Sequence, residues 1–348
     1  MRTLIVTVGT SLLSNAGKFL GKRPDFHALL GFLKKTAPKE ASAETNSIER
    51  ILRKDDQMVF LCSFTEEGRL CAEALKAYYN NKDIAVRIKE IRDLNYAESR
   101  FKLRGLRALV AEMVQAVNEE RQKGREVIIN ATGGFKAEIA YATLVGLLFD
   151  VTVYYIHERF REIIELPPVP IDWDFSIIAE YEDLFRWLND DYHAMEEVDR
   201  RLSVISEQDR RKISVLLEEE EGLICLGPTG EALFLAYMEK LRVAENVAVV
   251  LSTKARQTLN GYPPEVRRSF ESLLKKIRIA PLRRKQAHSI EGSDCLVFPS
   301  GHREERIFFF EEGGKVFVCE MTRHSDGSYQ QILSQGVYRK NYRFEGHA

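Results

Sequence analysis

The sequence has little cysteine and no long apolar run. Its five cysteines include no pair spaced by two residues, so neither a disulfide framework nor a zinc ribbon is supported: Cys62, Cys71, Cys225, Cys295 and Cys319. The longest apolar stretch, around residues 140–149, is far shorter than the ~20 residues of a membrane span. The apolar run at residues 4–6 is too short for a signal peptide. We therefore expect a reducing, cytoplasmic location and no membrane partner.

The chain also has almost no net charge. Its 348 residues are 45% hydrophobic and 30% charged, a composition that excludes low-complexity disorder. Its net charge of −1 conceals three unlike segments. Residues 1–170 carry 26 basic and 22 acidic side chains, residues 171–241 carry 7 and 18, and residues 242–348 carry 18 and 12. Segments this different suggest modules with different partners. The basic C-terminal segment is where nucleic acid is expected to bind.

Strand and helix patterns alternate over residues 1–170. Strands are expected at 2–8, 58–62, 85–88, 127–129 and 151–156, and helices at 48–54, 66–79, 100–123 and 135–148. This alternation predicts an α/β domain with a Rossmann-like, doubly wound parallel sheet. Prolines 167, 168 and 170 end it, because they can continue neither a helix nor a central strand.

Two further segments follow. In the acidic segment 171–245 we expect helices at 176–189, 193–205, 207–220 and 231–241, with a short strand and turn from residue 222. It is either a winged-helix-like linker or a solvated helical spacer. In residues 246–348 a strand at 247–251 and helices at 252–260 and 263–277 precede strands at 295–298, 306–310 and 315–321, and a short helix is expected at 329–333. A hairpin at 311–314 makes this an α+β domain with an antiparallel sheet.

Three strands of the first domain lead into loops rich in glycine and small hydroxyl residues, at 7–11, 63–65 and 130–136. In an open α/β sheet, ligands bind at the carboxyl ends of the strands. Backbone N–H groups at the following helix can receive phosphate, and Lys136 lies one turn into such a helix. The loops contain neither a Walker motif nor a GxGxxG fingerprint. Taken together they favour an anionic, nucleotide-like ligand over simple tight turns.

The motifs Thr-Val-Gly-Thr-Ser (7–11), Ser-Ala-Glu-Thr-Asn-Ser (42–47) and Asn-Ala-Thr-Gly-Gly-Phe-Lys (130–136) resemble those of CARF domains. These are the Rossmann-like sensors of type III CRISPR defence, and the resemblance covers residues 1–165. It implies that a cyclic oligoadenylate, with cyclic tetra-adenylate expected, binds across the two-fold interface of a homodimer. The ligand-binding positions carried over are Gly9, Thr10, Ser11, Thr132, Gly133, Gly134 and Lys136, with Asn46, Ser63 and Thr65 as weaker additions.

In the last domain, Arg306 begins one β run, Arg323 follows the next, and Tyr329 lies six residues further on. Metal-independent RNA cleavage needs a cation at the phosphate and groups that move protons to and from the reacting oxygens. Arginine supplies fixed charge with bidentate geometry, and tyrosine can exchange a proton. Taken singly, each of these residues is better explained by strand-edge charge, for Arg306 and Arg323, or by packing, for Tyr329. No metal and no cofactor is expected.

The layout of residues 251–265, 306–310 and 315–320, with Arg323 and Tyr329, resembles the RelE family of ribosome-associated messenger RNA nucleases. The resemblance implies cleavage of messenger RNA on the ribosome, with Arg306, Arg323 and Tyr329 as catalytic residues. One departure is clear, because the strand before Arg306 lacks the lysines that RelE toxins often carry there. The candidates to replace them are Arg283, Arg284, Lys285, His302 and Arg303, and we include Lys285 among the catalytic residues.

A CARF sensor joined to a RelE-like effector resembles the CRISPR-associated messenger RNA interferases, the Cami family. Two alternatives stay open. Arg283 and His288 fit the short Arg-x4–6-His signature of HEPN ribonucleases, although those domains are all-helical. A non-enzymatic, cyclic-oligoadenylate-responsive regulator could instead bind DNA through a winged-helix-like centre, against which the acidic charge of that segment counts.

Overall fold

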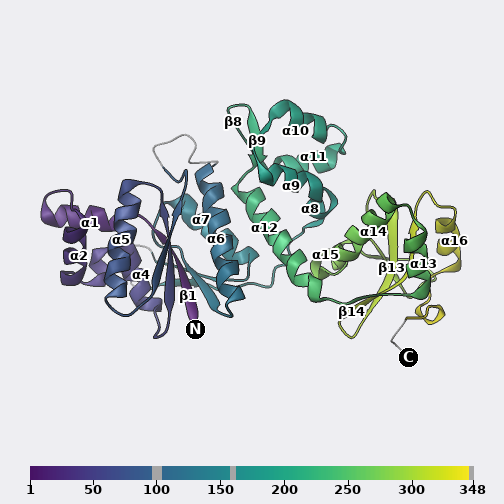
Figure 1. The fold of residues 1–348 in the computed structure, drawn as a ribbon, viewed down its shortest axis with the longest axis horizontal. Helices are drawn as coiled ribbons and strands as arrows, with labels where there is room; N and C mark the ends of the chain where they lie inside the picture. The colour runs from purple at the N-terminus through teal and green to yellow at the C-terminus, as the bar shows by residue number, and fades with distance from the viewer. Residues whose placement is uncertain (96–103, 157–161, 345–348) are drawn as a thin grey trace. The chain divides into compact units, whose positions relative to one another are not determined.

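The computed structural model describes residues 1–95, 104–156 and 162–344 and divides the chain into two compact units (Figure 1). Unit 1 comprises Met1–Ile171 and Asp183–Ala236, and unit 2 comprises Asp172–Glu182 and Tyr237–Ala348. The acidic middle of the sequence therefore contributes to both units. Within the described residues, no helix combines the length and apolar character that crossing a membrane requires.

Unit 1 is built on a six-stranded sheet with the order β3-β2-β1-β4-β5-β6. The first five strands are parallel, and β6 pairs antiparallel with β5. The strands are β1 (Arg2–Val8), β2 (Gln57–Ser63), β3 (Val86–Ile91), β4 (Glu126–Asn130), β5 (Thr152–Tyr155) and β6 (Ile164–Leu166). Since β2 lies on one side of β1 and β4 on the other, the strand order reverses beside β1, where open α/β sheets bind ligands.

Helices cover both faces of this sheet (Figure 1). They are α1 (Ser11–Leu20), α2 (Phe26–Lys35), α3 (Pro38–Ala41), α4 (Ala43–Ile51), α5 (Glu66–Asn80), α6 (Arg104–Gln122) and α7 (Lys136–Leu148). Leu4, Val6 and Val8 alternate along β1 and form one buried cluster with residues of α1, α2, α4 and α5. Side chains alternate across a strand, so Ile5, which is also fully buried, points to the face covered by α6 and α7.

The predicted parallel α/β sheet of the first domain is confirmed, and its five strands lie within a few residues of their expected positions. Helices α1, α2 and α3 and strand β6 were not predicted. The helix expected at 48–54 in fact begins at Ala43, because Ser42 caps it and accepts a hydrogen bond from the Thr45 N–H at 3.1 Å. Residues 100–103 of the helix expected at 100–123 lie outside the described residues.

The second segment of unit 1, Asp183–Ala236, contains helices and a small sheet with the strand order β7-β9-β8. Its elements are α9 (Glu182–Asp190), β7 (His193–Ala194), α10 (Met195–Leu202), α11 (Glu207–Ser214), β8 (Leu217–Glu220), β9 (Leu223–Leu226) and α12 (Pro228–Val243). This order resembles a winged helix and does not fit a bare helical spacer. The helix expected at 207–220 was wrong beyond Ser214, because pairing with β9 overrides the helical preference of the glutamates in β8.

Unit 2 holds a five-stranded sheet with the order β10-β14-β13-β12-β11, in which only β10 and β14 are parallel. Its strands are β10 (Val249–Leu251), β11 (His288–Ser289), β12 (Leu296–Phe298), β13 (Glu305–Glu312) and β14 (Lys315–Arg323). Its helices are α8 (Ser176–Glu180), α13 (Thr253–Gly261), α14 (Pro264–Lys276), α15 (Ala280–Gln286), α16 (Ser328–Gln335) and the 3₁₀ turns η2 (Ala244–Asn246) and η3 (Arg339–Asn341).

The α+β plan expected for residues 246–348 is confirmed, apart from the short elements α15 and β11. The hairpin between β13 and β14 turns at Gly313 and Gly314, with φ values of 55° and 74°. Glycine accepts these left-handed angles without steric cost, which is why the pair of glycines signalled the turn.

Candidate functional site

A cavity of about 220 Å³ opens at the carboxyl ends of β1, β2 and β4 in unit 1. Its lining residues are Gly9, Thr10, Ser11, Ala43, Glu44, Ser63, Thr132, Gly133, Gly134 and Phe135. The structure thus brings together seven of the ten predicted ligand-binding residues, which come from three loops far apart in the sequence. Thr65 and Lys136 do not line this cavity, and Asn46 lines an adjoining one.

Glycine is required where the β1 and β4 loops meet. A Cβ atom on Gly9 would lie 2.6 Å from the backbone nitrogen of Gly134, and one on Gly133 would lie 2.4 Å from the carbonyl oxygen of Thr7. Gly134 also adopts a φ of 95°, which L side chains rarely reach. These glycines therefore serve first to pack the two loops against each other.

A buried carboxylate that the sequence analysis did not single out lies under the cavity. Glu44, fully buried near the start of α4, accepts hydrogen bonds from the Gly9 N–H at 2.8 Å and the Ser11 hydroxyl at 3.0 Å. The Ser11 hydroxyl in turn accepts from the Ala43 N–H at 3.0 Å. Two donors predicted to face the ligand are thus already bound by an internal anion. Glu44 fixes the β1 loop against the first turn of α4.

Most of the predicted hydroxyl groups are also engaged within the protein. Thr132 donates to Asn130 at 2.7 Å and accepts from the Ile156 N–H at 3.2 Å. Thr65 caps α5 by accepting from the Gly68 N–H at 3.0 Å, and its oxygen lies 2.9 Å from that of Ser63. Ser63 and Thr132 therefore shape the cavity wall, and Thr65 serves as an N-cap.

The donors that remain are backbone N–H groups of the β4 loop. Within the described part of the chain, neither the Gly133 nor the Gly134 N–H has a hydrogen-bond acceptor, and the exposed Thr10 side chain makes no hydrogen bond. Successive N–H groups around a residue of positive φ form a concavity suited to an anion. The cavity therefore offers unpaired N–H donors, as an anion-binding site does.

A second, polar cavity of about 450 Å³ adjoins the first and shares Thr10, Ser11 and Ala43 with it. Lys18, Lys39 and Asn46 contribute to its wall. Neither lysine forms an ion pair with the described residues, so both ammonium groups can meet an external anion. No sequence motif pointed to these lysines, since they lie on separate helices and only the packing of α1 beside α3 puts them at one cavity.

Lys136, the predicted phosphate ligand, is the first residue of α7 and is exposed. It makes no ion pair among the residues that the structure describes. Asn46 accepts a hydrogen bond from Arg50 Nε at 3.3 Å.

In unit 2, Arg306 on β13 is buried, and its guanidinium donates to the carbonyls of Gly301, Arg303 and Glu305. Burial lowers the pKa of Arg306, while the neighbouring Tyr329 and Glu180 favour its charged form. The guanidinium is thereby fixed in place and holds the loop that precedes β13.

Three other residues of interest lie around this cation: His324, Tyr329 and Arg323. The His324 and Tyr329 rings are 4.2 Å apart, and burial together with the Arg306 charge lowers the pKa of His324. His324 is therefore neutral at neutral pH and able to accept a proton. Arg323, paired across the sheet with Glu305, has a buried Nε–H with no acceptor among the described residues. The structure thus gathers Arg306, His324 and Tyr329 where β13 begins and β14 ends, beside Arg323.

The predicted replacements for the absent lysines are mostly held by acidic partners. Lys285 is exposed and lies 3.8 Å from Asp174, and no contact joins it to the Arg306 cluster in the described residues. Arg284 pairs with Asp172 at 2.8 Å, and Arg303 with Glu180 at 3.0 Å.

The HEPN alternative fits the structure poorly. Arg283 is buried on α15 and makes two hydrogen bonds to Glu311, at 2.7 and 2.6 Å. His288 lies on β11 of the five-stranded sheet, and burial followed by the Arg306 charge lowers its pKa. An all-helical domain cannot contain this sheet. Among the described residues, no group of three or more His, Cys, Asp or Glu side chains is arranged to hold a metal ion.

Residues 39–169 match the family model of a CRISPR-associated protein, Cas_APE2256. This range contains α4, the loops after β2 and β4, and strands β2 to β6. The part of the chain that carries most of the cavity is therefore similar to a CRISPR-associated family, in agreement with the predicted CRISPR connection.

Two solved structures are also similar to the chain. Protein VC1899 from Vibrio cholerae shares 11% identity, with 70% of this chain and 68% of that chain covered, at a TM-score of 0.28. Can2 from Sulfobacillus thermosulfidooxidans, solved in complex with cyclic tetra-adenylate, shares 12% identity, with 96% and 84% covered, at a TM-score of 0.26. Both TM-scores are below 0.5, so these likenesses do not establish a shared fold.

Proposed function

We propose that the protein is a ribonuclease of type III CRISPR antiviral defence, switched on by a cyclic oligoadenylate that binds to the parallel-sheet domain of unit 1. The observation that carries the sensor half is the cavity at the switch point of the sheet, with the unpaired N–H groups of Gly133 and Gly134. The family match over residues 39–169 supports the CRISPR context. Cyclic tetra-adenylate is the proposed activator.

Three lysines lie at the two adjoining cavities or begin the helix beside them, and none of them forms an ion pair with the described residues. Lys18 and Lys39 flank the second cavity and Lys136 begins α7, so a ligand with several phosphates would meet charge on more than one side. A ring with two-fold symmetry matches two copies of the same loops, which is why we propose a homodimer.

For unit 2 we propose a RelE-like messenger RNA nuclease that acts on the ribosome and inhibits translation. In the proposed reaction the RNA 2′-hydroxyl attacks the adjacent phosphorus, and the bond to the 5′ oxygen breaks. The 2′ proton passes to the neutral imidazole of His324, and the leaving 5′ oxygen takes a proton from the Tyr329 hydroxyl, which regains one from water. Arg323 and Arg306 stabilise the negative charge of the pentavalent phosphate. Lys285 would reach the RNA only by leaving Asp174.

The test is an RNA cleavage assay on the full chain, with and without ribosomes, across cyclic oligoadenylates of different ring size. Calorimetric titration of each ring runs beside it. The proposal expects saturable binding of one ring and cleavage that depends on it, with 2′,3′-cyclic phosphate ends. Absence of binding to every ring would reject the sensor, and binding without any RNA cleavage would reject the effector.

A second candidate is a cyclic-oligoadenylate-responsive DNA-binding regulator, favoured by the winged-helix-like order of residues 182–243. Helix α11 displays basic residues, but Arg211 pairs with Glu207 and Lys212 with Asp209. The adjoining hairpin carries four successive glutamates at 218–221, which repel phosphates. Ligand-dependent retention of duplex DNA in a gel, without RNA cleavage, would favour this candidate.

A further inference from the structure

Two exposed phenylalanines stand beside the unit 1 cavity. Phe64 is 55% exposed and directly follows Ser63 of the cavity wall, and Phe135 is 51% exposed and lines the cavity itself. Single exposed apolar residues are ordinary on protein surfaces. Phe135 lines the cavity and Phe64 is adjacent in sequence to the lining residue Ser63, so two exposed rings come from two of the loops that supply the polar donors.

The Phe64 ring is held in place by its surroundings. The Arg69 guanidinium lies 5.0 Å from the ring centroid, and Arg69 is itself fixed by hydrogen bonds to Glu90 at 3.0 and 2.8 Å. The Phe64 N–H donates to the Ile91 carbonyl at 3.0 Å. A ring oriented in this way loses little freedom when a flat group stacks on it.

The spacing of the two loops suits a nucleotide. Phe64 follows β2 and Phe135 belongs to the β4 loop, and these strands are separated by β1 alone. Neighbouring strands lie about 4.8 Å apart, so the two loop origins are about 10 Å apart. The free N–H groups of Gly133 and Gly134, which line the same cavity as Phe135, suit phosphate, whereas the phenyl rings suit a base. Base-on-aromatic stacking is a common means of holding unpaired nucleotides.

We propose that Phe64 and Phe135 stack against bases of the bound nucleotide and thereby determine the preference of the site for a base-bearing ligand. This inference rests on the proposed function, since it takes the occupant of the cavity to be an oligoadenylate. The polar floor between the rings favours a nucleotide over an apolar face of a second copy of the chain.

The experiment measures binding of cyclic tetra-adenylate to the full chain by calorimetry. Phe64→Leu and Phe135→Leu keep apolar volume and remove the aromatic face, so each should weaken binding about ten- to a hundredfold. Phe64→Tyr and Phe135→Tyr keep the ring and should bind within about threefold of the parent. Phe19→Leu is the matched control, because Phe19 is 74% exposed on α1 but lines neither cavity, and its affinity should not change.

Circular dichroism and light scattering accompany each titration. Leucine variants that are folded and dimeric and bind like the parent would overturn the stacking role while leaving the sensor intact. Weakened binding that coincides with loss of the dimer would also overturn it, and would assign the rings to a contact between two copies. If the parent binds no cyclic oligoadenylate, both the proposed function and this inference fall.

Discussion

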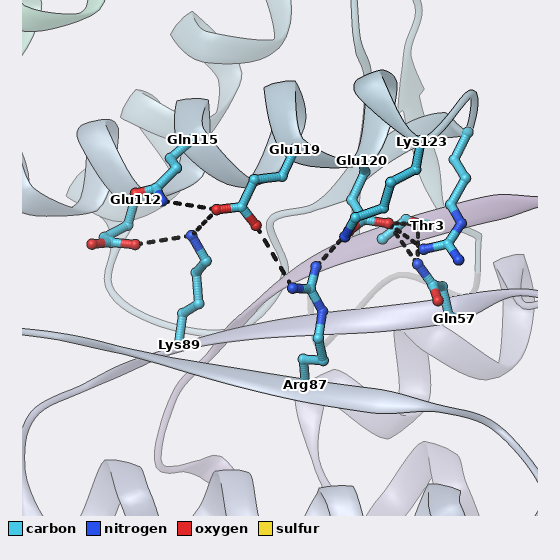
Figure 2. Close-up of polar contacts among 10 residues, drawn as sticks. Thr3, Gln57, Arg87, Lys89, Glu112, Gln115, Glu119, Glu120 and Lys123 are labelled. Atoms are coloured by element: carbon cyan, nitrogen blue, oxygen red, sulfur yellow. Dashed lines mark hydrogen bonds and ion pairs between the residues drawn. The ribbon is translucent and has the colours of Figure 1, made fainter.

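The buried carboxylate of Glu120 offers the sharpest stability prediction. Glu120 lies near the end of α6 and is fully buried at the amino ends of the strands (Figure 2). It accepts hydrogen bonds from five side chains. Those from Thr3, Gln57, Lys123 and Arg125 are 2.5–2.8 Å long, and the fifth comes from Arg87. Burial raises the pKa of Glu120, but the hydrogen bonds from Lys123, Arg125 and Thr3 outweigh it and lower the pKa from 4.5 to about 2.

The size of the effect follows from this pKa. A fall from 4.5 to about 2 corresponds to roughly 3 kcal/mol of folding free energy that is present when Glu120 is ionised. Because the folded pKa is the lower one, this contribution is complete above about pH 4.5 and is lost as the pH falls toward 2. Glu120→Gln keeps the volume and removes the charge, so it should cost roughly 3 kcal/mol at pH 7.

Urea unfolding should be followed by hydrogen exchange of peptides from β1, β2 and β3, because a signal from the whole chain would mix the transitions of two units. Glu119→Gln is the matched control. Glu119 is 31% exposed and contacts Lys89 at 3.2 Å and Arg87 at 3.6 Å, so its loss should cost under about 1 kcal/mol. The reasoning is refuted if Glu120→Gln is as stable as the parent at pH 7. It is also refuted if the difference between the two proteins does not shrink as the pH falls toward 2.

The remaining predictions concern function. Lys136→Ala should weaken both ligand binding and activation and leave the thermal stability unchanged, because the side chain is exposed; unchanged calorimetric affinity for every ring would reject it. Arg323→Ala and Tyr329→Phe should each slow RNA cleavage by about 2–4 kcal/mol of activation free energy without altering ring affinity, whereas His288→Ala should be nearly silent in the same gel assay. Since the pKa of His324 is lowered, the cleavage rate should fall only below about pH 6.5, and His324→Gln should abolish this limb of the pH–rate profile. Light scattering should show a homodimer without ligand, and a monomer with full ring affinity would contradict that expectation.

The loops of unit 1 show which features of the site could be predicted from the sequence and which could not. The spacing of strands and helices placed the residues at 7–11, 63–65 and 130–136 at one sheet edge, and eight of them line one cavity. The orientations of their side chains could not be predicted from the sequence, because a hydroxyl group beside a glycine can face either a ligand or the backbone. Ser11 and Thr132 turn toward Glu44, Ala43 and Asn130.

The chain by itself determined the class of both domains, because strand and helix periodicity and paired glycines are local properties. It determined the hairpin at Gly313 and Gly314 and most strand positions for the same reason. Only the tertiary structure decided that residues 217–220 form a strand, since pairing with β9 outweighs the helical preference of glutamate. It alone placed Glu44 beneath the β1 loop and Arg306 under three carbonyls, because burial and hydrogen-bond partners come from residues distant in sequence.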